Sequence, residues 1–136
     1  MADPKANEKL VLDYLEAMRV GDHPAAKAAF HADATWDTPP SMPWKSHFEG
    51  VDAIFGEYFA VDEDLFETGT SSYDLTTTCV IAGGDHVVVE MDHKAVGLNG
   101  KPYDTAHCLV FELRDGRIQA VREYVDSLYL KTQMMS

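Results

Sequence analysis

Residues 109–126 read LVFELRDGRIQAVREYVD, two runs of alternating side chains on either side of a tight turn. The RDGR segment at 114–117 supplies the positive φ angles that a short hairpin needs, so the two runs are predicted to pair as antiparallel strands. Alternation places one set of side chains on a common face of the second run: Ile118, Ala120, Arg122, Tyr124, Asp126 and Leu128. Asp126 therefore shares a face with apolar residues and is predicted to be a buried carboxylate.

The same alternation continues through the second half of the chain, in four β-rich segments separated by turns at 82–85, 98–101 and 114–117. This order predicts an antiparallel meander. In the third segment, His107 shares a face with larger side chains, namely Tyr103, Thr105, Leu109 and Phe111. In HVVVEMDHK, residues 86–94, Glu90 and Asp92 lie on the face opposite the apolar one, which is the pattern of a half-exposed strand.

The first half of the chain has helical periodicity instead. A first helix is predicted from Asp3-Pro4 to Gly21, with Tyr14 on its apolar face, because Asp-Pro suits a helix start and glycine a helix end. A second helix is predicted from about Pro24 to Phe30. A third, at about 51–59, has an apolar face that includes Phe55 and Phe59.

Two segments between these elements are predicted to be exposed. The prolines that follow Ala34 to Asp37 confine any strand to those four residues, so 38–50 is predicted to be a surface loop. The segment 61–69 is acidic and is expected to face solvent. Because the helices precede the strands, we predict an α+β fold in a single domain covering residues 1–136.

Composition limits the classes of partner. With 11 basic and 23 acidic residues, the formal net charge of -12 disfavours nucleic acid. The sequence shows neither a secretory signal nor a bilayer-spanning stretch, so a cytoplasmic location without membrane association is expected. Cys79 and Cys108 are interpreted as buried thiols in a reducing compartment, and the histidines show no metal-ligand spacing, so no metal is expected.

Several motifs in order carry a family resemblance. VGD at 20–22, FHADATWDTP at 30–39 and the closing FELRDGRIQAVREYVD at 111–126 resemble the SnoaL-like and ketosteroid isomerase-like families of the nuclear transport factor 2-like superfamily. The resemblance covers nearly the whole chain. It implies a cone, in which a curved antiparallel sheet wraps around the N-terminal helices and encloses an apolar pocket. It also implies a homodimer formed through the outer face of the sheet.

Comparison with ketosteroid isomerases concerns two polar groups. Tyr14 stands seven residues before Gly21, the place of the tyrosine that stabilises the oxyanion in those enzymes. His107 replaces their second oxyanion donor, and it can still donate a hydrogen bond to an enolate. Thr38 stands where their general-base aspartate precedes a proline, and Asp37 is one position early.

Two other members suggest different carboxylates. The sheet of limonene epoxide hydrolase aligns without a gap from Asp92 to Asp126, which makes Asp92 the acid and Asp126 the base, but Glu90 replaces the arginine between them. The residues that hold its attacking water correspond best to Trp36 and Thr38. SnoaL-type polyketide cyclases rely chiefly on one aspartate of the closing strand, whose place Asp126 takes.

The resemblance and the residues together predict a cofactor-independent acid–base enzyme, a cyclase, isomerase or hydratase-like catalyst of a small, largely apolar oxygenated molecule. Asp126 is predicted to be the principal acid or base, with His107 and Tyr14 polarising the substrate and Asp92 relaying a proton or orienting His107. Predicted substrate contacts are Trp36, Thr38, Glu90, Tyr124, Phe55 and Phe59. Two alternatives remain open: an epoxide hydrolase using Asp92 and Asp126, and a non-catalytic ligand-binding or dimeric structural module.

Overall fold

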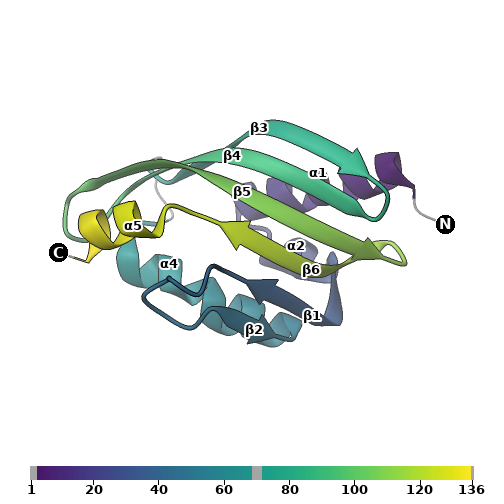
Figure 1. Cartoon of the computed structure of the whole chain (residues 1–136), viewed down its shortest axis with the longest axis horizontal. Coiled ribbons are helices and arrows are strands. Elements are labelled where there is room, and N and C mark those ends of the chain that lie inside the picture. Colours follow the sequence, from purple (N-terminus) through teal and green to yellow (C-terminus); the bar gives the residue numbers. More distant parts are fainter. Residues whose placement is uncertain (1–2, 69–71, 136) are drawn as a thin grey trace.

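The computed structural model describes residues 3–68 and 72–135, and one curved sheet organises them. The sheet has six strands in the order β2-β1-β6-β5-β4-β3. The predicted meander forms its larger part, with β3 at Asp74–Gly83, β4 at His86–Val96, β5 at Pro102–Arg114 and β6 at Arg117–Tyr124. These four strands pair antiparallel; β3, β4 and β5 are the long strands at the top of Figure 1, and β6 lies below β5.

The sheet continues beyond the meander through two strands from the first half of the chain. β1 at Phe30–Asp37 runs parallel to β6, and β2 at His47–Glu49 pairs antiparallel with β1. The prediction of an unbroken surface loop at 38–50 is therefore wrong at β2. That short strand forms because Phe48 pairs with Trp36 and both side chains are buried.

Two helices precede the sheet, and each begins at an aspartate cap. The first predicted helix is confirmed as α1, Pro4–Val20, in which the Asp3 carboxylate accepts a hydrogen bond from the Ala6 amide. It ends at Gly21, whose φ of 77° lies in the left-handed region that glycine adopts without strain. The second, α2, is shorter than predicted, at His23–Ala28, because Phe30 already belongs to β1.

The third predicted helix is longer than its apolar periodicity indicated. It comprises α3 at Val51–Ala53, a π-helical turn η1 at Ile54–Tyr58 and α4 at Ala60–Leu65. The π turn adds a residue to the helical repeat and so rotates the following turn relative to the preceding one. The helical path consequently runs on into the acidic segment that was predicted to be exposed.

A β-bulge in β6 decides which side chains of that strand face the helices. Leu113 pairs with Ile118, but Glu112 pairs with Ala120, so Gln119 is an extra residue without a partner on β5. The alternation therefore reverses after Ile118. Val121 and Glu123 are buried with Ile118, while Tyr124 is half exposed. The predicted inward face of this strand is correct at Ile118 and wrong from Ala120 onward.

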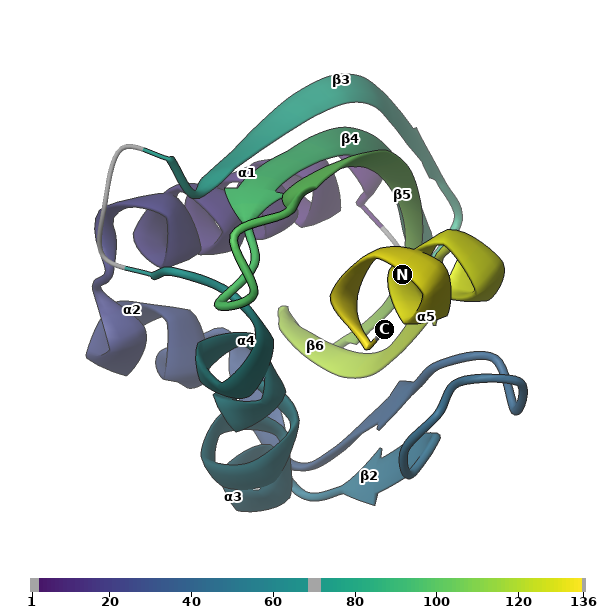
Figure 2. The same cartoon turned by 90° about the vertical axis from the view of Figure 1, so that its left-hand side faces the viewer.

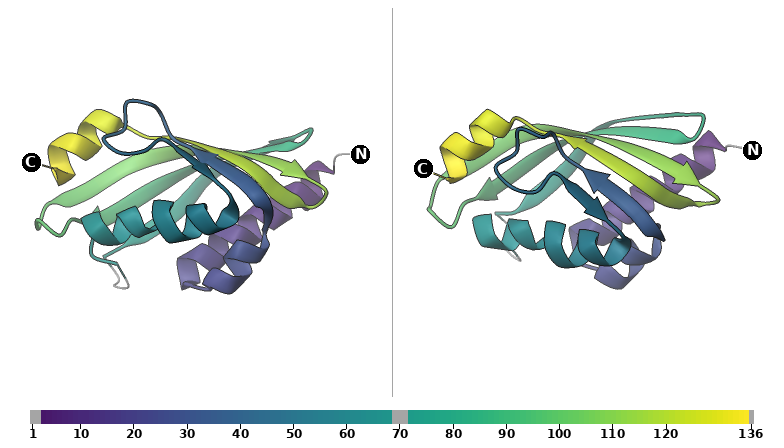
Figure 3. Two further views of the ribbon diagram at one scale, coloured as in Figure 1. Left: turned by 90° about the horizontal axis from the view of Figure 1, so that it is seen from below. Right: turned by 60° about the horizontal axis from the view of Figure 1, so that its bottom comes forward.

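The helices lie against the concave side of the sheet, as Figure 2 shows for α1 and for the path from α3 to α4. Figure 3 shows the same helices crossing beneath the strands. Between them the sheet and helices bury one hydrophobic core, centred on Val11, Phe30, Phe111, Ile118 and Val121. The predicted α+β class and the curved sheet wrapped around N-terminal helices are thus confirmed. The sheet is unclosed, and it is antiparallel except where β1 runs parallel to β6.

A helix that the sequence pattern did not indicate ends the described chain. α5, Ser127–Met134, follows β6 directly and packs at the end of the sheet opposite the N-terminus. Its buried residues Leu130 and Met134 join a second cluster with Phe66 and Tyr103. Among residues 3–68 and 72–135, no helix is both long and apolar enough to cross a bilayer.

Candidate active site

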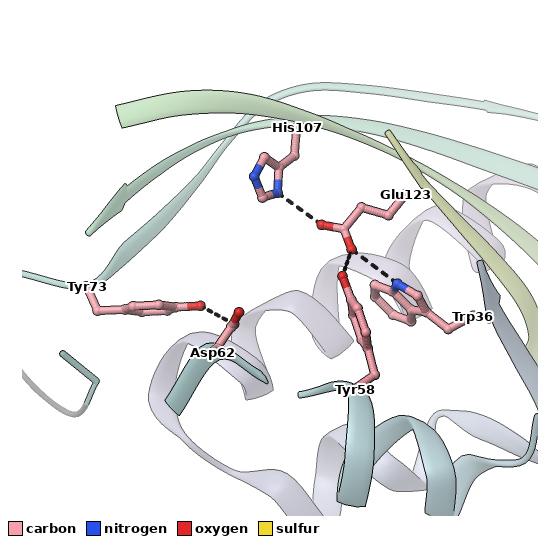
Figure 4. A network of polar contacts seen from close by, with 6 residues as sticks. All are labelled: Trp36, Tyr58, Asp62, Tyr73, His107 and Glu123. Carbon is pink, nitrogen blue, oxygen red and sulfur yellow. Dashed lines mark hydrogen bonds and ion pairs between the residues drawn. The ribbon is translucent and has the colours of Figure 1, made fainter. Parts of the chain in front are cut away.

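A cavity of about 620 Å³ lies between the concave face of the sheet and the helices. This volume is within the range of sites that hold drug-sized molecules. Its walls are largely aromatic and aliphatic, including Met18, Trp44, Phe59, Phe66, Tyr103 and Leu109. Two groups of polar side chains form hydrogen-bonded networks there, one around Glu123 and one around Asp62 (Figure 4). Other polar residues in the lining are Arg19, His23, Glu63 and Thr68.

The Glu123 carboxylate is the centre of the larger polar group. Its Oε1 atom accepts hydrogen bonds from the Trp36 indole, at 3.1 Å, and from the Tyr58 hydroxyl. Its Oε2 atom lies 3.1 Å from Nδ1 of His107. These three donors come from β1, η1 and β5, so a single carboxylate of β6 joins four elements around the cavity.

Glu123 remains ionised despite its burial. Burial on its own would raise the pKa of the carboxyl, because a charge is costly in an apolar interior. The hydrogen bonds from His107, Tyr58 and Trp36, together with the charge of His107, outweigh burial and lower the pKa below its ordinary value. The cavity therefore contains a fixed negative charge that is fully hydrogen-bonded.

This carboxylate sets the chemistry of His107. Because Nδ1 faces Glu123, that nitrogen carries the proton in the neutral ring, and Nε2 has the free lone pair. Nε2 is buried and has no hydrogen-bond partner among the described residues, and His107 lines the cavity. A carboxylate that orients an imidazole toward a substrate site is the arrangement used by general bases.

A second histidine, His93 of β4, lies edge-on against His107 with ring centroids 5.0 Å apart. Only 3% of its surface is exposed, and neither ring nitrogen has a hydrogen-bond partner among the described residues. Burial, and secondarily the charge of His107, lower its pKa to about 4. His93 is therefore neutral near pH 7.

The smaller polar group lies across the cavity on α4. The Tyr73 hydroxyl donates a hydrogen bond of 2.6 Å to Asp62 Oδ2. Burial raises the pKa of Asp62 to about 6; Tyr73 opposes this effect and Glu123 adds to it. The expectation that the acidic segment faces solvent is wrong at Asp62, because α4 extends the helix and turns this side chain inward.

Four of the residues predicted from sequence line the cavity: Tyr14, Trp36, Phe59 and His107. The predicted orientation of His107 is confirmed. Tyr14 is buried, and burial together with the negative charge of Glu123 raises the pKa of its hydroxyl, so it stays protonated. It can therefore donate a hydrogen bond but does not act as a base.

The carboxylates predicted from sequence do not reach the cavity. Asp126 is exposed and caps α5, accepting a 2.9 Å hydrogen bond from the Tyr129 amide. Asp92 and Glu90 are exposed on the convex face, as alternation with the buried Met91 requires. The prediction that Asp92, Asp126 and His107 meet in one pocket is therefore wrong. Asp126 lies outside the cavity because the bulge at Gln119 reverses the alternation of β6.

Three predicted substrate contacts also lie elsewhere. Tyr124 is half exposed on the convex face. Thr38 is buried but does not line the cavity. Phe55 packs edge-on against Phe30 and lies outside the cavity lining.

Glu123, Tyr58, Asp62 and His93 are functional candidates that the sequence reasoning missed. A signal for Glu123 was present, because it lies between Val121 and Val125, whose β-branched side chains match an inward face better than Ala120 does. His93 continues the inward set Val87, Val89 and Met91. Tyr58 lies on the apolar face that the helical periodicity of residues 51–59 predicts, whereas Asp62 follows the π turn, for which we find no signal in the sequence.

No group of three or more potential metal ligands occurs within residues 3–68 and 72–135. The two cysteines are free and only half-buried. They face Glu90 from the neighbouring strands, as the register pairs Cys79 and Cys108 each with that residue. The charge of Glu90 adds to the effect of burial in raising the pKa of Cys108, so the structure gives no reason to expect a reactive thiolate there.

Comparison with solved structures identifies the fold. The chain superposes on a nuclear transport factor 2-like protein of unknown function from Burkholderia pseudomallei with a TM-score of 0.85, 20% identity and 100% of both chains covered. Bal32a, from a soil-derived mobile gene cassette, is 26% identical over 93% of each chain, with a TM-score of 0.79. An epoxide hydrolase of the limonene type from M. tuberculosis is 19% identical, with a TM-score of 0.74, and covers 98% of this chain and 92% of its own.

No curated protein matches the chain in sequence. The sequence pattern of one protein family matches residues 11–121 of the chain, from α1 through the bulged part of β6. This range includes most of the residues that surround the cavity. The chain therefore belongs to the SnoaL-like domain family.

Proposed function

We propose that this protein is a cofactor-independent acid–base enzyme that uses His107 to move a proton on a small, largely apolar oxygenated molecule. The observation that carries the proposal is the position of one imidazole between a buried, ionised carboxylate and an open cavity. Nδ1 of His107 is held by Glu123, while Nε2 has no partner among the described residues. Such an arrangement costs stability unless a bound molecule uses the free nitrogen.

The proton transfer follows from this geometry. Nε2 accepts a proton from the substrate, and the imidazolium that forms is stabilised by the adjacent Glu123 carboxylate. Tyr14 keeps its hydroxyl proton and lines the same cavity, so it can donate a hydrogen bond to the oxygen on which negative charge develops. Asp62, with a pKa of about 6, can in its protonated form donate a proton to another atom of the substrate.

The walls determine the substrate class. Two tryptophans, Trp36 and Trp44, and several phenylalanines and tyrosines line the cavity, which favours a molecule with a flat or bulky apolar body. The polar groups stand at its margins. A carbonyl compound with an acidic α C–H bond combines such a body with a proton that an imidazole can remove.

Solvent deuterium exchange tests the proposal without knowledge of the natural substrate. The enzyme is incubated in D2O with 2-tetralone, 2-indanone or cyclohexanone, and loss of the α-proton signals is followed by proton NMR. We expect exchange above the buffer rate for at least one ketone, and a decrease of about a hundredfold in His107→Gln. Asp126→Asn is the control and is expected to retain the wild-type rate, because Asp126 is outside the cavity.

The competing class is a non-catalytic binding module. It predicts that the same ketones bind, as seen by line broadening of their NMR signals, without any acceleration of exchange. An exchange rate that His107→Gln leaves unchanged also contradicts the proposal, because proton transfer would then use another group.

A further inference from the structure

His93 has no role in the proton transfer described above, yet it is the most unusual polar side chain of the cavity wall. Both its ring nitrogens and Nε2 of His107 are buried without a hydrogen-bond partner among the described residues. An unsatisfied buried polar group destabilises the folded state, because it loses its hydrogen bonds to water and gains none from the protein. Two neighbouring imidazoles with three such nitrogens indicate that something absent from the protein chain completes them.

Aromatic rings fix the orientation of His93. The rings of Phe66, Tyr73 and Tyr103 pack against it with centroid separations of 5.4, 5.0 and 5.3 Å. His107 occupies a further side at 5.0 Å. The side chain also lines the cavity, so its ring forms part of the wall that a bound molecule contacts.

The two imidazoles have different hydrogen-bonding abilities. In its neutral form His107 offers a lone pair at Nε2, since Glu123 holds its Nδ1 proton. Neutral His93 has one N–H donor and one acceptor nitrogen, and no carboxylate pairs with it in the described part of the chain. A group that donates to His107 and accepts from His93 therefore satisfies both rings.

We propose that His93 is a substrate-binding residue, and that it and His107 together bind the hydroxyl of a flat, apolar phenol or enol. The inference rests on the proposed function and names its substrate class. The hydroxyl O–H donates to Nε2 of His107 while its oxygen accepts the His93 N–H. When the O–H bond breaks, the proton goes to Nε2 and the electron pair stays on oxygen, where the His93 N–H stabilises it.

This arrangement predicts discrimination between a hydroxyl and a methyl ether. A methyl ether cannot donate to His107, so it leaves a buried acceptor unpaired, whereas a hydrophobic pocket alone would bind both compounds with similar affinity. The probes are 2-naphthol and 2-methoxynaphthalene. Nitrogen-15 NMR of the histidine rings follows each titration, because it reports both the affinity and the rings that the ligand contacts.

The wild type is expected to bind 2-naphthol at least about tenfold more tightly than 2-methoxynaphthalene, with shifts at both His93 and His107. His93→Phe is expected to weaken the binding of both probes by about threefold to tenfold, because the oxygen of each accepts the His93 N–H, and to keep the preference for the hydroxyl, which depends on His107. His93→Leu provides a second variant in case the first does not fold. His86→Phe is the control, because His86 is exposed at the start of the same strand.

The outcomes separate this inference from the proposed function. Unchanged affinity of His93→Phe and His93→Leu for both probes, with the preference lost in His107→Phe, overturns the role of His93 and leaves proton transfer by His107 intact. Equal affinity of the wild type for both probes overturns the inference. The deuterium-exchange assay then decides independently whether His107 is a base.

Discussion

Glu123→Ala is expected to lower the free energy of unfolding by about 3–5 kcal/mol, because each buried donor left without an acceptor costs about 1–3 kcal/mol. The substitution leaves the Trp36 N–H, the Tyr58 hydroxyl and Nδ1 of His107 without their acceptor in a region closed to water. It also opens a cavity at the centre of the network. Urea denaturation at pH 7 measures the loss.

Asp126→Ala provides the matched control, as it removes a carboxylate only three residues away in sequence. The Asp126 carboxylate caps α5, so we expect a loss of about 1 kcal/mol. Glu123→Gln keeps the shape and can still accept hydrogen bonds from Trp36 and Tyr58. It should therefore retain more stability than Glu123→Ala. Equal losses of unfolding free energy in Glu123→Ala and Asp126→Ala would show that the hydrogen bonds to Glu123 do not stabilise the fold more than a helix cap does.

Because the pKa of His93 is low in the folded protein, its free energy of unfolding is expected to decrease by about 3 kcal/mol as the pH falls from 6.5 to 4. Its pKa is about 4 in the folded protein and near the ordinary value of 6.5 in the unfolded chain. The unfolded chain therefore binds the proton first. This contribution to stability is complete above pH 6.5 and is lost progressively as the pH falls toward 4.

The measurement compares urea denaturation of the wild type and His93→Phe at pH 7 and pH 4. The decrease should be about 3 kcal/mol smaller in the variant, and His86→Phe should behave as the wild type does. The wild type is compared with the variant because other groups around the site also titrate and change the stability of both proteins. These groups are His107, Glu123, Asp62, Tyr73 and Tyr103. Equal decreases in the wild type and His93→Phe would show that His93 is not held neutral.

Protonation of Asp62 changes the stability of the protein with pH in the direction opposite to protonation of His93. Its folded pKa of about 6 is above the ordinary value of 3.8, so the folded protein binds this proton first. The folded state gains stability relative to the unfolded state as the pH falls through 6, and the gain is complete below pH 3.8. Because Asp62 is present in both the wild type and His93→Phe, its contribution cancels when the two proteins are compared.

The sequence predicted the parts of the fold that depend on local periodicity. The cap at Asp3, the glycine at position 21 and the hairpin turn at 114–117 define α1 and the meander without any knowledge of packing. His107 was placed correctly because β5 alternates without interruption from Tyr103 to Leu109. Each of these results needed only neighbouring residues.

The site could not be predicted in the same way, because it depends on two irregularities in regular elements. The bulge at Gln119 exchanged Asp126 for Glu123, and the helical path that continues past the π turn brought Asp62 into the cavity. An irregularity of this kind is stabilised by contacts between distant segments, such as the hydrogen bonds of Trp36 and Tyr58 to Glu123. The homodimer inferred from resemblance stays a prediction.

Gln119 lies outside the cavity lining, and yet the way in which β6 accommodates this residue decides the charge of the interior. If β6 kept Gln119 but paired without the bulge, Leu109 would pair with Arg122, and a guanidinium would face His107 in place of the Glu123 carboxylate. Deletion of Gln119 together with the bulge would instead keep Leu109 opposite Glu123 and preserve the negative charge. The local backbone shape of one strand, and not only the identity of its residues, therefore determines the chemistry of the cavity.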